Sequence, residues 1–275
     1  MKEYKKGTVR IRAGEIEIGE GVTFGKDIDI IAKDRFAIGA RSRLGDNIHI
    51  RGRNIIFGAD LYHSEGLRIG GGGCDRPRAN FSIGDRCTIH NNYINIAESV
   101  VIGDDVGLSP DVFIITHGFW KSVLDGFPAK FAPVVIENGA IIGQRSIIMM
   151  GLTVGENCVV GAHSVVTKSL ESNSIYAGNP ARFIRQVERP SQVDRGRLLE
   201  GIIEEYAEIA RYHGYRGKIR WMYPHVYFDG VDINVETFEV FGEETDWTDD
   251  LRDHLRRYGI RCYTERPFKS MMDWS

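Results

Sequence analysis

Aliphatic residues recur at every sixth position over long stretches of the chain. Between residues 136 and 168 one register holds only aliphatic residues, and small residues recur at the fifth position of the hexads. The aliphatic residues of this register are Ile136, Ile142, Ile148, Val154, Val160 and Val166. A strand has a period of about 2 and an amphipathic helix one of about 3.6, so neither element alone explains the pattern. A short strand followed by a tight turn does explain it.

The same spacing occurs earlier in the chain, in several registers. Its members are Ile18, Phe24, Ile30, Ile38, Leu44, Ile50, Ile56, Ile83, Ile89, Ile96, Ile102, Leu108 and Ile114. Three hexads would form a triangular coil of about 18 residues, and successive coils would pair as parallel strands about 4.8 Å apart. The aliphatic residues would then fill a prism, with Gly, Asn and Asp at corners where a positive φ is needed.

Two segments interrupt the repeat. Residues 70–81, GGGGCDRPRANF, are too rich in Gly and Pro for a coil face, and residues 117–133, HGFWKSVLDGFPAKFAP, carry aromatic residues in place of corner residues. We expect both to be loops that leave the prism.

The pattern changes after residue 186. Apolar residues at helical spacing, from Leu198 to Ile209, predict a helix that stops at Gly214. Strands and a turn are expected within residues 226–242, a short helix from Thr248 to Gly259, and a last strand at residues 260–265. The sequence therefore predicts an all-β prism domain at residues 1–186 and a small α+β appendage at residues 187–275.

Composition excludes some classes of protein. The 275 residues are 42% hydrophobic and carry a formal net charge of −3, which gives no global basic field for nucleic acid or an anionic membrane. The N-terminus lacks the apolar stretch of a signal peptide, and no window resembles a membrane span, so we expect a cytoplasmic protein. The cysteines lack the paired spacing of a zinc site and are expected to be ordinary buried or partly buried thiols.

Three motifs together resemble those of the hexapeptide-repeat acetyltransferases, especially the galactoside, maltose, xenobiotic and related sugar O- or N-acetyltransferases. They are Thr116-His117, SVVTK at 164–168 and AGNPARFIR at 177–185. The resemblance implies a left-handed parallel β-helix, although general chirality would favour a right-handed crossover. It also implies direct transfer of an acetyl group from acetyl-CoA to a hydroxyl or amine of a sugar. His117 matches the family's general base, and imidazole suits that role because it titrates near neutral pH.

The same resemblance implies how acetyl-CoA is bound. Gln144 and Ala162 match contacts with pantetheine, made mostly through the backbone, and the N–H of Gln144 is a candidate oxyanion donor. The positions that match contacts with the nucleotide phosphates are Thr167, Lys168, Arg182 and Arg185. Basic side chains are the expected partners of phosphate oxygens. Ile141 departs from the family, which usually has an aromatic residue there.

Candidates for acceptor binding are less specific. Asn91 or Asn92 matches an asparagine that holds the sugar in related galactoside enzymes, but both also suit corners of the prism. Trp120, Lys121 and Asp125 could contact a sugar, or the aromatic residue could anchor the loop. His90 suits packing or substrate contact, and His49, His63 and His163 are expected at solvent or corner positions.

Other classes remain open. Gamma-type carbonic anhydrases share the fold but need two further histidines in register, one of them shortly after His117, and residues 118–132 contain none. We therefore expect no metal. A non-catalytic scaffold would not need His117, the loops and the basic residues together. The resemblance further implies a homotrimer with active sites between subunits, and the appendage is expected to cap the open end of the prism.

Overall fold

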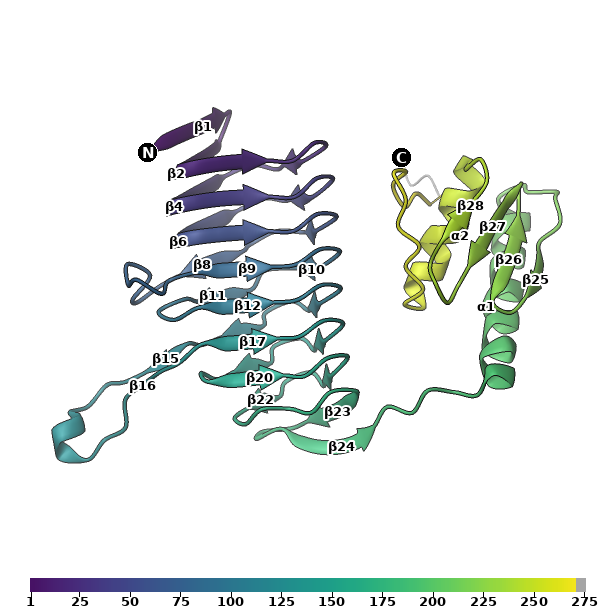
Figure 1. The fold of residues 1–275 in the computed structure, drawn as a ribbon. Helices are drawn as coiled ribbons and strands as arrows, with labels where there is room; N and C mark the ends of the chain where they lie inside the picture. Colours follow the sequence, from purple (N-terminus) through teal and green to yellow (C-terminus); the bar gives the residue numbers. More distant parts are fainter. Residues whose placement is uncertain (271–275) are drawn as a thin grey trace. The chain divides into compact units, whose positions relative to one another are not determined.

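The computed structural model describes residues 1–270 and divides the chain into two compact units. The first is Met1–Glu188, and the second begins at Arg189. Each has a hydrophobic core of its own. The first unit is a left-handed parallel β-helix, as expected from the sequence, and its stacked coils are drawn in Figure 1.

The β-helix has three faces, which successive stretches of each coil cover in turn. Strand β1 (Lys2–Lys6) lies antiparallel to the first long strand and begins the unit. In the early coils one long strand covers the first and second faces, and these strands are β2 (Val9–Ile18), β4 (Ile28–Ile38) and β6 (Ile48–Phe57).

In later coils each face has its own short strand. The first face continues with β8 (Arg68–Gly70), β11 (Tyr93–Asn95), β14 (Phe113–Ile114), β19 (Ile147–Ile148) and β22 (Val165–Val166). The second face continues with β9 (Phe81–Ile83), β12 (Val100–Ile102), β17 (Val134–Ile136) and β20 (Leu152–Val154).

The third face is made only of short strands. They are β3 (Thr23–Phe24), β5 (Arg43–Leu44), β7 (Tyr62–His63), β10 (Thr88–Ile89), β13 (Gly107–Leu108), β18 (Ile141–Ile142), β21 (Val159–Val160) and β23 (Ser174–Ala177). Strand β24 (Arg182–Gln186) pairs antiparallel with β23, so the parallel stack stops there.

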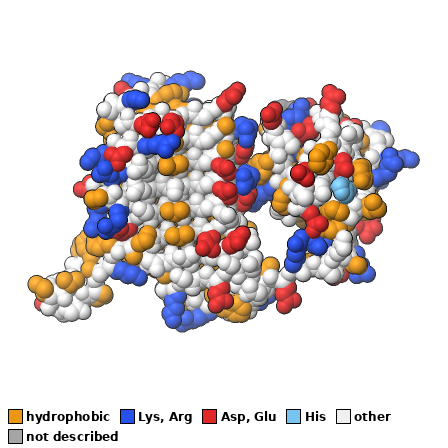
Figure 2. All heavy atoms as spheres, in the orientation of Figure 1, with side chains coloured by type: hydrophobic (Ala, Val, Ile, Leu, Met, Phe, Trp, Pro, Cys, Tyr) orange, Lys and Arg blue, Asp and Glu red, His pale blue; other side chains and the backbone are white. Residues whose placement is uncertain are grey.

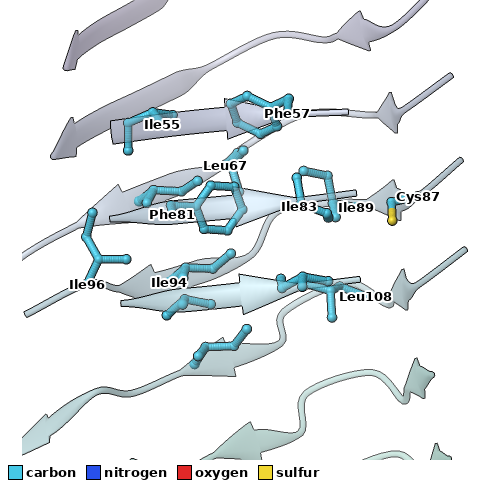
Figure 3. Close-up of a cluster of buried hydrophobic side chains, with 14 of the residues drawn as sticks. Ile55, Phe57, Leu67, Phe81, Ile83, Cys87, Ile89, Ile94, Ile96 and Leu108 are labelled. Carbon is cyan, nitrogen blue, oxygen red and sulfur yellow. The ribbon is translucent and has the colours of Figure 1, made fainter. Parts of the chain in front are cut away.

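The parallel register stacks equivalent residues of successive coils into columns. On the first face the inward column is Ile30, Ile50, Ile69, Ile94, Ile114, Ile148 and Val166. All of them are fully buried, and Figure 3 shows side chains of the middle coils pointing into the prism. The period of six therefore reflects burial, because each hexad delivers one aliphatic side chain to the interior.

Two assignments within the repeat are wrong in detail. Phe57, not Ile56, is the inward residue that pairs with Ile38 and Ile83 on the second face. Ile96 is buried as predicted, but Ile94 carries the first-face column. Both errors arise at the corner between the first and second faces, where the chain holds more residues than a regular hexad.

His63 was expected at a solvent or corner position, and that prediction is also wrong. It lies fully buried in the third-face column, paired with Ile89. Its Nδ1 accepts a hydrogen bond of 3.1 Å from the backbone N–H of Gly45. Burial lowers the pKa of His63 to about 4, so the side chain is neutral inside the prism at pH 7. The hexad repeat is irregular between residues 57 and 83, so the sequence alone did not show which residues of this stretch face the interior.

Many residues at the other corners of the prism have a φ in the left-handed region. Between the second and third faces these residues include Asp60, Arg86, Asp105 and Asn157. Gly45 shows how closely coils approach at a corner, since a Cβ there would lie 1.6 Å from the carbonyl oxygen of Ser64. Such positions explain the Gly, Asn and Asp residues at fixed intervals.

Both interruptions of the repeat leave the prism between the first and second faces. Residues 71–80 connect β8 to β9 as an irregular loop. The second segment is a hairpin of β15 (His117–Gly118) and β16 (Lys130–Phe131), which pair antiparallel, with a 3-10 turn, η1 (Val123–Asp125), beyond them. Figure 1 shows the hairpin projecting away from the coils.

The second unit packs two helices with an antiparallel sheet. Its elements are α1 (Gln192–Tyr212), β25 (Arg220–Met222), β26 (His225–Phe228), β27 (Val231–Asn234), β28 (Val240–Phe241) and α2 (Asp246–Arg257). Ser191 caps α1, and Gly214 lies just beyond its end with a positive φ. Leu199, Ile203 and Tyr206 of α1 are buried in the core of this unit.

Two predictions for this unit are wrong. Helix α2 begins at Asp246 because Thr245 forms a capping box with Thr248, which places Thr248 inside the first turn. Residues 260–265 form no strand. Instead, the buried guanidinium of Arg252 donates hydrogen bonds to the carbonyls of Cys262 (3.0 Å) and Arg266 (3.1 Å), which fixes this segment without a sheet. Within residues 1–270, no helix is long and apolar enough to cross a membrane.

Candidate active site

His117 lies where a coil strand becomes the hairpin. The inward residue Ile114 ends β14, Thr116 is still fully buried, and His117 begins β15 with its side chain half-buried. The imidazole is therefore attached to the rigid wall of the prism, while the chain beyond it is exposed. We call the corner between the first and second faces, from which both loops leave, the base edge.

Asn95 holds the imidazole from the preceding coil. Its amide Nδ2 donates hydrogen bonds of 3.1 Å to the carbonyls of Gly70 and Gly72, which fixes the orientation of the amide because carbonyls can only accept. Its Oδ1 accepts from the Thr116 hydroxyl (2.6 Å) and lies 2.7 Å from His117 Nδ1. Nδ1 must therefore carry the proton, and in the neutral ring Nε2 keeps a lone pair.

Aromatic rings and a glycine surround the imidazole. The rings of Phe119 and Phe131 have centroids 5.4 and 5.6 Å from that of His117, and Phe131 is inclined to it by only 13°. On the loop of residues 71–80, a Cβ at Gly72 would lie 3.6 Å from Nε2. The absence of a side chain at Gly72 therefore leaves space next to the nitrogen that bears the lone pair.

Burial lowers the pKa of His117 below that of an ordinary imidazole, and the positive charge of Arg76 lowers it further. The guanidinium carbon of Arg76 lies 4.3 Å from the centroid of Phe131, which itself stacks on His117. At neutral pH the imidazole is thus predominantly neutral and can accept a proton at Nε2.

The other residues suggested by the sequence lie at two different edges of the prism. Thr167 and Lys168 follow β22 as His117 follows β14, so they share the base edge. Asn91, Asn92, Gln144 and Ala162 follow third-face strands and lie at the corner between the third and first faces, which we call the Gln144 edge. The first face separates the two edges, so one chain does not bring these residues to His117.

The two asparagines at the Gln144 edge differ in exposure. Asn92 is only 1% exposed, and its amide accepts from the backbone N–H of His90 (2.9 Å) and donates to the carbonyl of Ser109 (2.8 Å). Asn91 is exposed and hydrogen-bonds the side chain of Asp111. Both side chains make hydrogen bonds at this corner, but neither residue has the positive φ of a corner asparagine.

The hairpin residues Trp120 and Asp125 are exposed. Trp120 is 92% exposed, so Phe119 and Phe131, rather than Trp120, hold the base of the hairpin against His117. Leu124, near the tip, is 94% exposed, and Figure 2 shows hydrophobic side chains gathered on this projecting segment. Such an apolar surface on a projecting loop is typical of a segment that contacts a partner.

The basic residues of the C-terminal motif are also exposed. Arg182 and Arg185 lie on β24, and Arg185 donates a hydrogen bond of 3.2 Å to the carbonyl of Gln186. Thr167, Lys168, Gln144 and Ala162 are exposed as well. Among residues 1–270, no group of three His, Cys, Asp or Glu side chains is arranged to hold a metal ion.

Asn95, Phe131 and Arg76 were not identified from the sequence. Asn95 left one usable signal, a polar residue between Ile94 and Ile96 where the repeat delivers apolar side chains to the interior. Phe131 and Arg76 left none, because their proximity to His117 depends on how the two loops fold against each other.

A parallel β-helix made of hexads places this chain in the class of hexapeptide-repeat proteins. Residues 133–168 match the family model described as the hexapeptide repeat of succinyl-transferase. The chain is 34% identical over 137 residues to the galactoside O-acetyltransferase of Escherichia coli (strain K12), a match that covers 50% of this chain and 63% of that protein. It is 32% identical over 146 residues to the same organism's "Putative lipopolysaccharide biosynthesis O-acetyl transferase WbbJ", covering 48% and 72%. The chain belongs to the hexapeptide-repeat acetyltransferase family.

Solved structures with a similar fold include two acetyltransferases. The hexapeptide-repeat acetyltransferase VCA0836 from Vibrio cholerae is 25% identical, with a TM-score of 0.41, and the match covers 48% of this chain and 73% of that one. The polySia-specific acetyltransferase NeuO is 19% identical, with a TM-score of 0.45, covering 74% and 99%. The chain spans less than two thirds of the galactoside enzyme's own length.

Proposed function

We propose that this protein transfers an acetyl group from acetyl-CoA to a hydroxyl or amine of a sugar, with His117 as the general base. The observation that carries the proposal is the contact of 2.7 Å between His117 Nδ1 and Asn95 Oδ1, with the amide of Asn95 fixed by two backbone carbonyls. This arrangement leaves the Nε2 lone pair of a neutral imidazole beside an open space, as a base for acyl transfer requires.

In the proposed reaction the acceptor attacks the thioester carbonyl while Nε2 removes its proton. The C–O or C–N bond forms, the tetrahedral intermediate collapses, and the C–S bond breaks. The imidazolium then returns the proton to the departing CoA thiolate, so no acyl-enzyme is formed. The Asn95 carbonyl would stabilise the imidazolium by accepting a hydrogen bond from its Nδ1–H, as in other hydrogen-bonded catalytic histidines.

Acetyl-CoA would bind along the prism. We propose that the backbone at Gln144 and Ala162 contacts pantetheine and that the N–H of Gln144 stabilises the oxyanion. The residues proposed for the nucleotide phosphates are Thr167, Lys168, Arg182 and Arg185. Their exposure is consistent with this role, since a ligand of that size and charge binds at a surface rather than in the core.

The separation of the base edge from the Gln144 edge supports a composite site. We propose a homotrimer with C3 symmetry, in which the Gln144 edge of one subunit meets the base edge of its neighbour. Exposed apolar side chains on the outer faces, including Val101, Phe113 and Ile141, are consistent with contacts between subunits. Asn91 lies at the Gln144 edge and would reach an acceptor at His117 only in such an assembly, whereas Trp120 and Asp125 lie on the hairpin that His117 begins. Asn92 is the weakest candidate because its amide is already satisfied.

The test is acetyl transfer from labelled acetyl-CoA to a panel of sugars and nucleotide sugars, with the product identified by mass spectrometry. His117→Ala should lower kcat by about 10²- to 10⁴-fold, the usual contribution of a general base, with little change in affinity for CoA. His49→Asn, at an exposed position of the early strand β6, is the matched control and should keep full activity. Unchanged turnover in His117→Ala would rule out the mechanism.

A further inference from the structure

The loop of residues 71–80 carries two arginines with different surroundings. Arg78 donates to both carboxylate oxygens of Glu98, at 2.5 and 2.8 Å, and Glu98 is only 3% exposed. This pair ties the loop to the prism. Arg76 has no carboxylate oxygen within 4 Å of its guanidinium nitrogens among residues 1–270. Its guanidinium lies instead over the ring of Phe131, a neutral partner.

Arg76 also acts electrostatically on His117. Its charge is one of the two causes that lower the pKa of His117, the other being burial. Asn95, Thr116, Phe119 and Phe131, which contact or surround the imidazole, are all uncharged. The pKa of Glu98 is lowered mainly by its hydrogen bonds with Arg78 and in addition by the charge of Arg76, so this one carboxylate faces two arginines and leaves one positive charge in excess near the imidazole.

Two other arginines of the base edge are each paired with a carboxylate. Arg51 pairs with Asp29, and Arg53 pairs with Asp34 at 2.8 Å. Figure 2 shows basic side chains along the edge of the prism above the hairpin. Arg76 is thus a cation next to the base whose partner, within the described chain, is only an aromatic face.

The excess positive charge at this place affects the chemistry. When His117 accepts the acceptor's proton, the imidazolium and Arg76 repel each other. A negative charge on the acceptor, bound by Arg76, would offset this repulsion in the transition state and would also position the acceptor at Nε2. A neutral acceptor would gain neither effect.

We infer that the acceptor carries a carboxylate or phosphate close to the hydroxyl or amine that is acetylated, and that Arg76 binds this anion beside His117. The inference rests on the proposed acetyl transfer and narrows its substrate class to anionic sugars. It makes Arg76 a specificity-determining residue, whereas Arg78 is structural.

The test compares matched charged and neutral acceptors in wild-type protein, Arg76→Gln, Arg76→Lys and Lys33→Gln. Lys33 is exposed on an early coil, so Lys33→Gln removes one positive charge away from the base. The acceptor pairs are methyl galactoside with its galacturonate counterpart, and methyl glucoside with glucose 1-phosphate. Two readouts are used: kcat/KM for acetyl transfer, and protection of His117 from diethyl pyrocarbonate, measured on its peptide by mass spectrometry.

Wild-type protein and Lys33→Gln should prefer a charged acceptor by about tenfold or more, the scale of one charge-assisted hydrogen bond. Arg76→Gln should lose the preference for the charged acceptor, and Arg76→Lys should keep part of that preference. Equal protection by charged and neutral sugars in the wild type, or a preference that persists in Arg76→Gln, overturns the inference. If no sugar is acetylated but the charged sugars still protect His117 through Arg76, acetyl transfer fails while the anion site stands.

Discussion

At the scale of single residues, the site depends on an amide rather than a carboxylate behind the histidine. Asn95 fixes the Nδ1–H tautomer of His117 without adding a negative charge. A carboxylate in that place would raise the basicity of the ring and hold it protonated at a higher pH. With the amide, burial and Arg76 keep the pKa of His117 low, which favours the neutral imidazole that the proposed base requires.

Two substitutions of Asn95 should distinguish its role in orienting His117 from the effect of a charge at this position. Asn95→Ala should lower kcat by about 10- to 100-fold, as loss of such outer partners does at other sites, with little change in KM for acetyl-CoA. Asn95→Asp should raise the pKa of His117 and shift the acid limb of the kcat/KM pH profile to higher pH. Asn157→Ala, at a remote corner, is the control. An unshifted pH profile in Asn95→Asp would show that Asn95 does not act through His117.

At the scale of elements, the columns of the β-helix tolerate one polar exception. His63 replaces an aliphatic residue in the third-face column, where the neighbouring coils have Leu44 and Ile89. Its Nδ1 satisfies the backbone N–H of Gly45. The column therefore stays filled, but it contains a side chain that can take up a proton when the protein unfolds.

His63 should make the stability of the prism depend on pH. Its pKa is about 4 in the folded chain and about 6.5 when unfolded, so the unfolded state binds more protons between these values. The free energy of unfolding should fall by about 2 kcal/mol from pH 7 to pH 5 through this group alone.

Urea unfolding of His63→Leu at the two pH values tests this directly. The difference in the free energy of unfolding between pH 7 and pH 5 should be smaller in the variant than in the wild type. The comparison uses this difference, and not the stability at pH 7, because the variant also removes the hydrogen-bond acceptor of the Gly45 N–H. His163→Asn, whose histidine is exposed, should keep the wild-type difference. If His63→Leu keeps it too, the buried histidine is not the sensor of pH.

At the scale of the whole molecule, a single chain does not bring the proposed site residues together. His117, Thr167 and Lys168 lie at the base edge, and Gln144 and Ala162 lie at the Gln144 edge across the first face. The exposed hairpin tip adds apolar surface that one chain does not cover. Both features favour assembly of several copies. The capping role of the second unit and the cytoplasmic location stay predictions.

Light scattering on purified protein should give a mass near three times the 31.0 kDa of one chain. Leu124→Asp should weaken the assembly and lower acetyl transfer together, because it places a charge in a contact expected to be apolar. Val193→Asp alters an exposed apolar residue of α1 and should change neither. An active monomer would refute the composite site.

The sequence was sufficient for features that depend on local spacing. Hexads predict the prism because each short strand and turn buries its own aliphatic residue, and this geometry repeats from Ile136 to Val166. The end of α1, just before Gly214, is local in the same way. In the prism, the wrong predictions fall where the hexad spacing is broken, at Phe57 and His63. In the second unit, the strand predicted at residues 260–265 does not form.

The tertiary structure alone decided which side chains meet. Asn95 reaches His117 from the preceding coil, and Arg76 reaches Phe131 from a different loop. Coil stacking brings together residues that are far apart in the chain, and loop folding depends on packing rather than on any period. The sequence by itself therefore determined the β-helix and a histidine at its edge. The tautomer of that histidine, its positive surroundings and the separation of the two edges required three dimensions.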